Sequence, residues 1–303
     1  MSHRLVGTAF VMFAAVAFSF KAILVKLAYR HGVDPLTLLA LRMAFSAPFF
    51  VAIAYGWSRD GALRRLSVPD WARIAALGLL GYYLASYFDF LGLQYISAAL
   101  ERLVLFLYPT FVVILSALLF GRRITRRDVL ALSLSYVGIA MVVAVDLSAG
   151  HRNVALGVFW VLLSALCYAI YLVGNGRMVS TVNSVVFACV ASVFSCVGVL
   201  VHFLLVGEVS QLFDQPWPVY AYSGVMAVVS TVLPVIVMSE GIRRVGSSQA
   251  SMLGTVGPVA TIIFGATLLS EPVTAIQLGG AALVLGGVLF ITVAKPQTKT
   301  ASG

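Results

Sequence analysis

Two charged residues of opposite sign lie side by side just inside a long apolar run. They are Glu101 and Arg102, in the segment ISAALERLVLFLYP. Such groups can form ion pairs, carry protons or bind a charged substrate, but a charge at the centre of a bilayer costs about 2.5–3.5 kcal/mol. Further charged residues interrupt other apolar runs, namely Lys21, Arg42 and Asp89. Ionisable residues kept inside apolar helices indicate a functional site.

Depth along the expected helices places these groups, and Lys26, in the outer part of the bilayer. Glu101 and Arg102 point in different directions, because adjacent residues are about 100° apart around a helix. Candidate partners for Glu101 are Lys21 and Arg42, and Asp89 is a candidate partner for Arg102. One interpretation is an ion-pair network that closes the outer side, with snorkelling Lys and Arg side chains. The other is recognition of a zwitterionic or anionic substrate, or a coupling proton on Glu101.

We therefore predict substrate-site roles for Lys21, Arg42 and Glu101, and gate or coupling roles for Glu101, Arg102 and Asp89. Aromatic residues are candidates for a cavity wall that contacts substrate, with packing and an interfacial belt as the alternative. Tyr83 and Tyr87 share a helix face at i, i+4, and the other aromatic candidates are Trp160 and Tyr168.

Prolines and small residues predict breaks in three helices, at Pro109, at Pro234 and at Gly257-Pro258. A proline removes a backbone donor and can free a carbonyl toward a cavity. Close helix packing is the alternative role for the small residues. Beside the last break, the side chains available to hydrogen-bond a ligand are Gln249, Ser251 and Thr255.

Composition identifies a polytopic membrane protein. The 303 residues are 61% hydrophobic and 10% charged, whereas a soluble protein carries about 25% charged residues. The net charge of +9 comes from residues in short loops, which favours a topology signal over nucleic-acid binding. The three cysteines show no disulfide or metal-binding spacing, and we predict neither a metal nor a cofactor.

Runs long enough to span a bilayer define ten expected transmembrane helices. Their ranges are 5–28, 35–56, 71–91, 97–119, 128–146, 154–174, 184–206, 217–239, 247–269 and 275–294. With a cytoplasmic N-terminus, the outside loops carry only Arg30 and Arg152. The cytoplasmic segments then carry Arg4, Arg59, Arg64, Arg65, Arg122, Arg123, Arg126, Arg127, Arg177, Arg243, Arg244, Lys295 and Lys299. The positive-inside rule thus places both termini in the cytoplasm.

An internal repeat divides the chain. Residues 92–138 align without gaps on 241–287, so that Pro109 meets Pro258 and Thr125 meets Thr274. We predict an all-α protein of two five-helix repeats, residues 1–146 and 147–294, with a cytoplasmic tail 295–303. Five is odd, so the repeats insert with opposite orientation, an architecture used for alternating access.

Three segments resemble the EamA-type members of the drug/metabolite transporter superfamily, which have ten helices. They are LRMAF with Arg42, GLQYISAALERLVLFLYP, and the stretch from EGIRRVGSSQ to LVLGGVLF. The family's halves commonly end helix 4 or 9 with a Glu, and LLSEPVT keeps it as Glu271, whereas LLFGRRIT has Arg122 there. The resemblance implies secondary transport of small metabolites, often export of amino acids, through a cavity between the repeats.

We predict a secondary transporter of the bacterial inner membrane that exports amino acids or derivatives. Its partners are a small-molecule substrate and the lipid bilayer but no nucleic acid, and it is a monomer or weak dimer. Proton antiport, substrate exchange and facilitated diffusion are all compatible with the sequence. Alternatives are a nucleoside, a sugar-derived compound or an organic cation as substrate, or a receptor. An enzyme is disfavoured, because HExxH, GxSxG and GxxxxGK[ST] are missing from the sequence.

Overall fold

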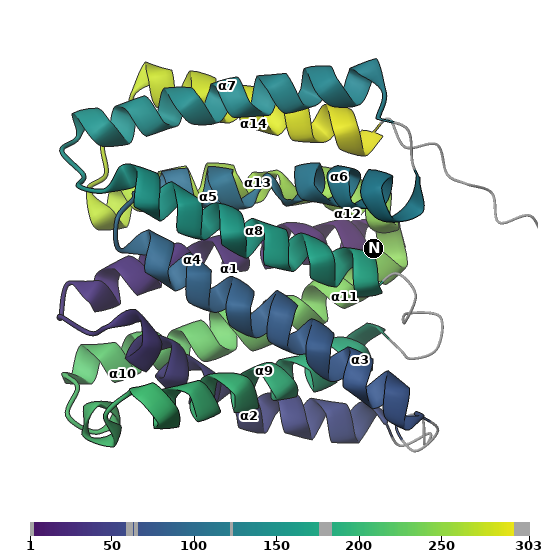
Figure 1. The fold of residues 1–303 in the computed structure, drawn as a ribbon, viewed down its shortest axis with the longest axis vertical. Coiled ribbons are helices and arrows are strands. Elements are labelled where there is room, and N and C mark those ends of the chain that lie inside the picture. The colour runs from purple at the N-terminus through teal and green to yellow at the C-terminus, as the bar shows by residue number, and fades with distance from the viewer. Residues whose placement is uncertain (1–2, 59–62, 64–65, 122–123, 176–183, 294–303) are drawn as a thin grey trace, which may run out of the picture.

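The computed structural model of the chain is a bundle of helices that run from one side of the view in Figure 1 to the other, with α7 and α14 nearly parallel and helices such as α3, α4 and α9 inclined to them. It describes residues 3–58, 63, 66–121, 124–175 and 184–293. The first repeat contains α1 His3–Tyr29, α2 Pro35–Trp57, α3 Val68–Gly78, η2 Leu79–Leu84, α4 Ala85–Leu93, α5 Ala98–Leu105, α6 Tyr108–Phe120 and α7 Arg126–Ser148. The second contains α8 Val154–Asn175, α9 Ser184–Val206, η3 Val209–Leu212, α10 Trp217–Ala227, η4 Val228–Val232, α11 Leu233–Val245, α12 Ser247–Gly254, α13 Val256–Phe264, η5 Gly265–Leu269 and α14 Ala275–Val293.

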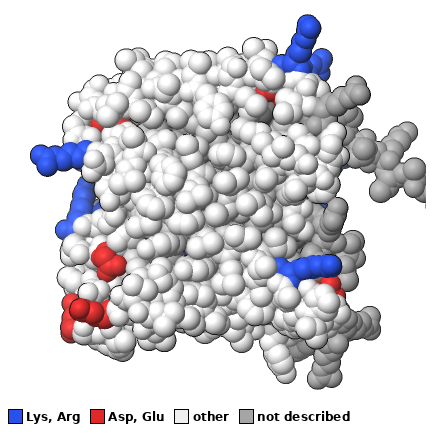
Figure 2. Space-filling model, in the orientation of Figure 1, with Lys and Arg blue, Asp and Glu red and all other residues white. Residues whose placement is uncertain are grey.

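The predicted all-helical membrane fold is confirmed. Among the described residues, nine helices are long and apolar enough to cross a membrane, and Ala275–Phe290 is a shorter apolar helix. Figure 2 shows the matching surface, because Lys, Arg, Asp and Glu gather at the two ends of the helices and leave an uncharged band between them. The eighth span continues to Val245 instead of ending at residue 239.

Successive spans alternate in direction, which gives the bundle two distinct ends. We call the end that carries the start of α1, Trp57 and Arg243 the near end, and the opposite end, which carries Tyr29, Leu93 and Leu269, the far end. Because each repeat has an odd number of spans, α1 starts at the near end and its equivalent α8 starts at the far end. The two repeats are therefore inverted.

Glycine contacts show the internal symmetry at atomic level. A Cβ on Gly138 of α7 would lie 2.5 Å from the carbonyl oxygen of Gly280 on α14, and a Cβ on Gly287 would lie 2.5 Å from that of Ala131. Both residues of the first contact map onto the second at the offset of the sequence repeat. A pseudo-two-fold axis thus passes between α7 and α14, which form one outer layer in Figure 1. Small residues let these helices approach closely.

Interruptions of the helices also occur in pairs. Phe106 and Leu107 separate α5 from α6 just before Pro109, and Thr255 separates α12 from α13 just before Gly257 and Pro258. The π-helical turns η2 and η4 occupy equivalent places in the third and eighth spans, and Pro234 begins α11 directly after η4. Breaks of this kind are tolerated at membrane depth where the backbone lines a cavity.

Candidate functional site

A cavity of about 1190 Å³ lies between the two repeats. Polar residues of the first repeat in its wall are Lys21, Arg42, Tyr82, Ser86, Asp89, Arg102 and Tyr108. Polar residues of the second repeat are Ser164, Tyr168, Tyr171, Ser192, Ser195, Ser230, Thr231, Ser239, Glu240 and Arg243. The exposed side chains of Trp57 and Arg243 belong to the wall, so the cavity reaches the surface at the near end.

Three ionisable side chains meet where the cavity ends toward the far side, and we call them the lysine–carboxylate cluster: Lys21, Asp89 and Glu101. Nζ of Lys21 lies 2.6 Å from Oδ2 of Asp89 and 3.6 Å from Oε1 of Glu101. The cluster joins α1, α4 and α5. Asp89 reaches the cavity wall, whereas Glu101 is 0% exposed and lies behind it. Of the two sequence-predicted partners of Glu101, the structure brings Lys21 to it.

Two arginines add positive charge to the same region. Arg42 donates from Nη2 to Oγ of Ser86 at 3.0 Å, and its guanidinium lies 5.0 Å from the ring centroid of Phe90. Arg102 faces the cavity, and its Nε is buried without a hydrogen-bond partner among the described residues. The expected pair of Arg102 with Asp89 does not form, because Asp89 is bound to Lys21. Arg102 is thus a cation free to meet an anionic group.

The missing side chain of Gly257 makes room for Arg102. A Cβ at Gly257 would lie 3.0 Å from Nη2 of Arg102. The carbonyl of Gly257 accepts a hydrogen bond from Oγ of Ser19 at 2.8 Å. The break in the ninth span therefore lies beside Arg102 of α5 and beside α1.

A group of tyrosines forms the polar part of the wall on the second-repeat side. The hydroxyl groups of Tyr82 and Tyr171 are 3.0 Å apart, and the rings of Tyr168 and Tyr171 stack with centroids 5.9 Å apart. Tyr108 meets Tyr168 edge to face at 5.2 Å. The cavity wall thus combines cationic groups with neutral hydroxyl and aromatic groups, which suits an amphipathic solute.

The start of α5 is tied to two other parts of the chain. Its N-cap Ser97 accepts from the backbone N–H of Leu100, and donates from its own N–H and Oγ to Asp146 at 2.7 and 2.8 Å. Oε1 of Glu271 accepts from the N–H of Ala98 at 2.9 Å. Burial raises the pKa of Glu271 from its ordinary value. These bonds hold the helix that carries Glu101 and Arg102.

Further contacts close the far end around α1. The hydroxyl of Tyr29 donates to the carbonyl of Phe90 at 2.8 Å, and Nη2 of Arg30 donates to the carbonyl of Leu269 at 2.9 Å. The second contact joins the first repeat to the second. The cavity is therefore open at one end and sealed at the other.

Several sequence-predicted cavity residues lie elsewhere. Tyr83 and Tyr87 are outside the cavity lining, and both rings contact His202 on α9, with the Tyr83 hydroxyl 2.8 Å from its Nδ1. Trp160 stacks on Phe88 at 5.6 Å and is also outside the lining. The neighbouring face of the same span, with Tyr82 and Ser86, is the one that faces the cavity, and sequence spacing alone does not distinguish the two faces.

The predicted hydrogen-bonding residues of the ninth span also have other positions. Gln249 is exposed, and the side chain of Ser251 lies outside the described residues. Oγ1 of Thr255 donates to the carbonyl of Met252 at 2.7 Å. Of the aromatic candidates Tyr168 lines the cavity. Sequence reasoning missed Tyr82, Tyr108, Tyr171 and the serines of the wall, although Tyr171 and Ser192 are the repeat equivalents of Lys21 and Arg42.

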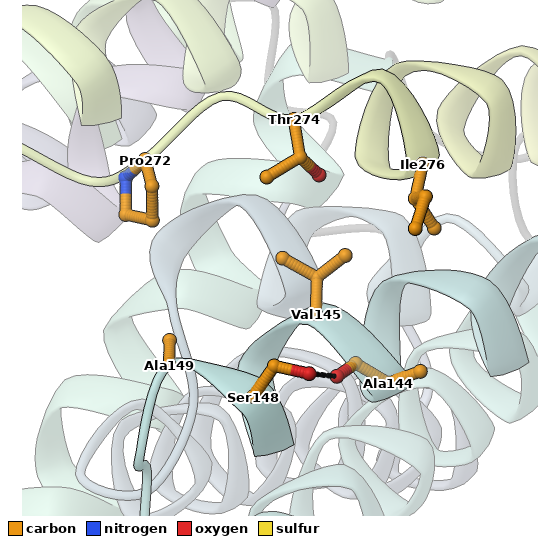
Figure 3. Close-up of a pocket in the computed structure, with 7 residues that line it drawn as sticks. All are labelled: Ala144, Val145, Ser148, Ala149, Pro272, Thr274 and Ile276. Carbon is orange, nitrogen blue, oxygen red and sulfur yellow. Dashed lines mark hydrogen bonds between the residues drawn. The ribbon is translucent and has the colours of Figure 1, made fainter.

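A second, smaller pocket of about 310 Å³ lies between the end of α7 and the segment before α14. Figure 3 shows its seven lining residues, mostly apolar, including Val145, Pro272 and Ile276. Oγ of Ser148 bonds only to the carbonyl of Ala144, at 2.7 Å. The pocket shares no residue with the central cavity and has no charged group.

Comparison with known proteins gives a consistent result. The EamA-like transporter family matches twice, over residues 5–144 and 155–293. An uncharacterized transporter, YcbK, of Bacillus subtilis (strain 168) is 29% identical over 98% of this chain and 95% of its own length. A probable amino-acid metabolite efflux pump of Salmonella typhimurium is 26% identical over 87% of each chain. A crystal structure that is 18% identical covers 96% of each chain with a TM-score of 0.60 and shares the fold.

Proposed function

The chain belongs to the EamA-like transporter family, and from that premise we propose that it is a secondary transporter that exports small organic metabolites, foremost amino acids or their derivatives. The observation that carries the proposal is the large cavity between inverted repeats, which reaches the surface only at the near end within the described structure. A site enclosed by two inverted repeats is the arrangement that alternating access requires.

The mechanism follows from the inequality of the two ends. In this conformation the first repeat closes the far end and the second leaves the near end open. Exchange of the two repeat conformations would open the far end and close the near one, with the solute kept between them. The solute then crosses without any continuous pore.

The chemistry of the wall supports a solute with a carboxylate. Lys21 is engaged by Asp89, so Arg102 and Arg42 are the cations available to a ligand. Guanidinium groups bind carboxylates through two parallel hydrogen bonds. The tyrosine hydroxyls and rings of the same wall suit an amino group and an apolar side chain. The relative named as an amino-acid metabolite efflux pump agrees with this class of solute.

Charge in the loops supports the orientation. With both termini in the cytoplasm of a bacterium, the near end faces the cytoplasm and the cavity is loaded from inside. A reporter fused to the C-terminus of the full chain, and found on the outside, would reverse this assignment. We also propose that protons take part in transport and that the protein is a monomer or a weak dimer.

Counterflow into proteoliposomes tests the proposal. Vesicles are preloaded with one unlabelled compound, and uptake of its labelled form is followed without an ion gradient, for amino acids, nucleosides, sugar derivatives and organic cations in turn. We expect accumulation of an amino acid or derivative. Accumulation of a compound from another class would support transport but contradict the proposed substrate class. Folded protein that accumulates none of these compounds would contradict the whole proposal.

A matched pair of variants on α9 links the flux to the cavity. Ser192 lines the cavity and is buried, whereas Val197 of the same helix is 53% exposed on the outside of the bundle. Ser192→Trp would fill the cavity and is expected to abolish counterflow, whereas Val197→Trp is expected to retain it. Equal fluxes in the two variants would show that the solute takes another route.

A further inference from the structure

Glu101 is buried, and the described residues around it donate no hydrogen bond to its carboxyl group. It is 0% exposed, and neither of its carboxyl oxygens accepts a hydrogen bond within the described structure. A buried carboxylate costs several kcal/mol unless it is paired and hydrogen-bonded, and such a group instead takes up a proton. Glu271 provides the contrast, because it is a half-buried carboxyl near the far end whose Oε1 accepts from a backbone N–H.

The single lysine of the cluster cannot serve both carboxyl groups. Its Nζ is at hydrogen-bond distance from Asp89, at 2.6 Å, but lies 3.6 Å from Glu101, beyond the range of an N–H···O bond. The Asp89 and Glu101 side chains are also close enough to bond to each other. Two ionised carboxylates are both acceptors, so they form that bond only when one of them carries a proton.

The elements that pack on α5 differ in the charged groups that they bring near Glu101. The α8 and α13 segments contain no Asp, Glu, Lys, Arg or His. The groups that face the site from the remaining elements are Lys21, Lys26, Asp89, Arg102, Asp146 and Glu271. Asp146 is bonded to Ser97, and Arg102 points to the cavity. None of these groups donates a hydrogen bond to Glu101 in the described structure.

We propose that Glu101 is a proton-binding site, and that the bound proton keeps the far end closed. This inference rests on the proposed function. With the proton in place, the cluster is a neutral Lys21–Asp89 pair to which the Glu101 hydroxyl donates, and it can be buried. Without the proton the cluster has a net negative charge, which is better solvated when the far end opens to water.

The proton has a route to this site. Glu101 itself is sealed, but Lys21 and Asp89 line the cavity. A proton from cavity water can bind to Asp89 and pass to the adjacent oxygen of Glu101. Glu101 releases its proton by the same route to cavity water before the far end opens. In the open state it takes up a proton from the opposite compartment, and the far end closes again. Opening and closing the far end therefore moves a proton as well as the solute, which provides the coupling of an antiporter.

The test measures, without any substrate, whether the cavity is open toward the far side. Cys167, Cys189 and Cys196 are replaced by serine or alanine, and Ser86, which lines the cavity beside Asp89, is changed to cysteine as a reporter. A membrane-impermeant maleimide is applied to sealed vesicles from the far side over a range of pH. The rate is divided by the near-side rate at the same pH, which removes the intrinsic pH dependence of the thiol.

We expect the far-side to near-side ratio to rise several-fold with increasing pH in the reporter protein. Glu101→Gln imitates the protonated form, so its ratio should stay low at every pH, whereas the control Glu208→Gln, at an exposed position after α9, should keep the pH response. A response that persists unchanged in Glu101→Gln, or a reporter protein without any pH response, would overturn the proposal. Counterflow does not enter this readout, so failure here leaves the proposed transport function standing.

A second measurement covers the case in which Glu101→Gln does not fold. Infrared spectra of the wild-type protein should contain the C=O stretching band of a buried, protonated carboxylic acid, which shifts in heavy water. Its loss on raising the pH should parallel the rise of the labelling ratio. A wild-type spectrum with no such band at any pH where the protein is folded would overturn the proposal.

Discussion

The two repeats place different chemistry on the same backbone positions. In the first repeat Lys21, Asp89 and Glu101 meet in a charged cluster at the far end. Their repeat equivalents in the second are Tyr171, Met238 and Ala250, all of which line the open part of the cavity. Neutral side chains can close an end by packing alone, whereas a cluster of charges closes it only when its charges are balanced.

The starts of the fourth and ninth spans show the same contrast. The α5 helix is capped by Ser97 and held by Asp146 and Glu271, whereas α12 begins at Gly246 with no side-chain cap. Gly246 has a φ of 84°, a conformation that glycine adopts at little cost. The difference indicates that the far-end closure is held by specific polar bonds, for which the start of α12 has no counterpart among the described residues.

The largest effect is expected at Lys21. Lys21→Met leaves two adjacent carboxyl groups without a cation, and removal of one partner from a buried ion pair costs about 3–5 kcal/mol. We expect a marked fall in the thermal unfolding temperature and loss of counterflow. Tyr171→Phe, at the equivalent position of the second repeat, is the matched control and should unfold close to the wild type. Equal falls in unfolding temperature and counterflow in the two variants would contradict the proposed difference between the charged cluster of the first repeat and its neutral equivalents in the second.

Arg102 provides the next test, because its repeat equivalent is the uncharged Ser251. Arg102→Gln removes the cation proposed to bind the substrate carboxylate. Hydrogen bonds to charged groups contribute about 1.5–3 kcal/mol, so the half-saturation concentration in counterflow should rise about 10- to 100-fold. Arg127→Gln, at an exposed position on α7, is the control for loss of an arginine. An unchanged half-saturation concentration in Arg102→Gln would remove Arg102 from the site.

The cap of α5 should have a smaller effect on stability. Ser97→Ala removes the acceptor for Leu100 and one donor to Asp146, and loss of an N-cap costs about 0.5–2 kcal/mol. Ser148→Ala is the control, because that hydroxyl bonds only to a carbonyl of its own helix. Thermal unfolding measures both variants. A Ser97→Ala protein as stable as the control would show that the far end does not depend on this cap.

Two neighbouring tyrosines test which face of the third span serves the cavity. Tyr82→Phe removes a hydroxyl that faces the cavity and Tyr171, and Tyr83→Phe removes one that bonds to His202 outside it. A neutral hydrogen bond contributes about 0.5–1.5 kcal/mol. We expect a rise of about 2- to 10-fold in half-saturation concentration for Tyr82→Phe only. The reverse order would place the substrate on the other face.

The smallest effect is expected at Glu271, whose equivalent in the first repeat is Arg122. Burial raises the pKa of Glu271 in the folded state above its unfolded value, so its contribution to stability is greatest in acid and falls as the pH rises through the folded pKa. Glu271→Gln keeps the acceptor for Ala98 but cannot titrate. The unfolding temperature of the variant should therefore decline less than that of the wild type from acid to neutral pH, and parallel curves would contradict this.

The positions of the ten spans, the internal repeat and the inversion could be predicted from the sequence. Apolar runs of bilayer length and a constant offset between repeats are local signals that need no tertiary information. The placement of Lys21, Lys26, Arg42, Asp89, Glu101 and Arg102 in one part of the bilayer followed from depth, because helix length converts residue number into distance along the bundle. Depth does not give the direction around the helix, and this is why Tyr83, Tyr87 and Trp160 were assigned to the cavity wall although they lie outside it.

The sequence by itself thus determined the membrane class, the repeats and the set of charged residues that the bilayer core must accommodate. Only the tertiary structure decided that Lys21 binds Asp89, that Arg102 faces the cavity with no partner for its Nε among the described residues, and that Glu101 is sealed behind them. The physical reason is that pairing depends on the relative rotation of α1, α4 and α5. That rotation is set by glycine contacts between distant helices, such as Gly7 against Gly241 and Gly92 against Gly157, and no local pattern encodes it.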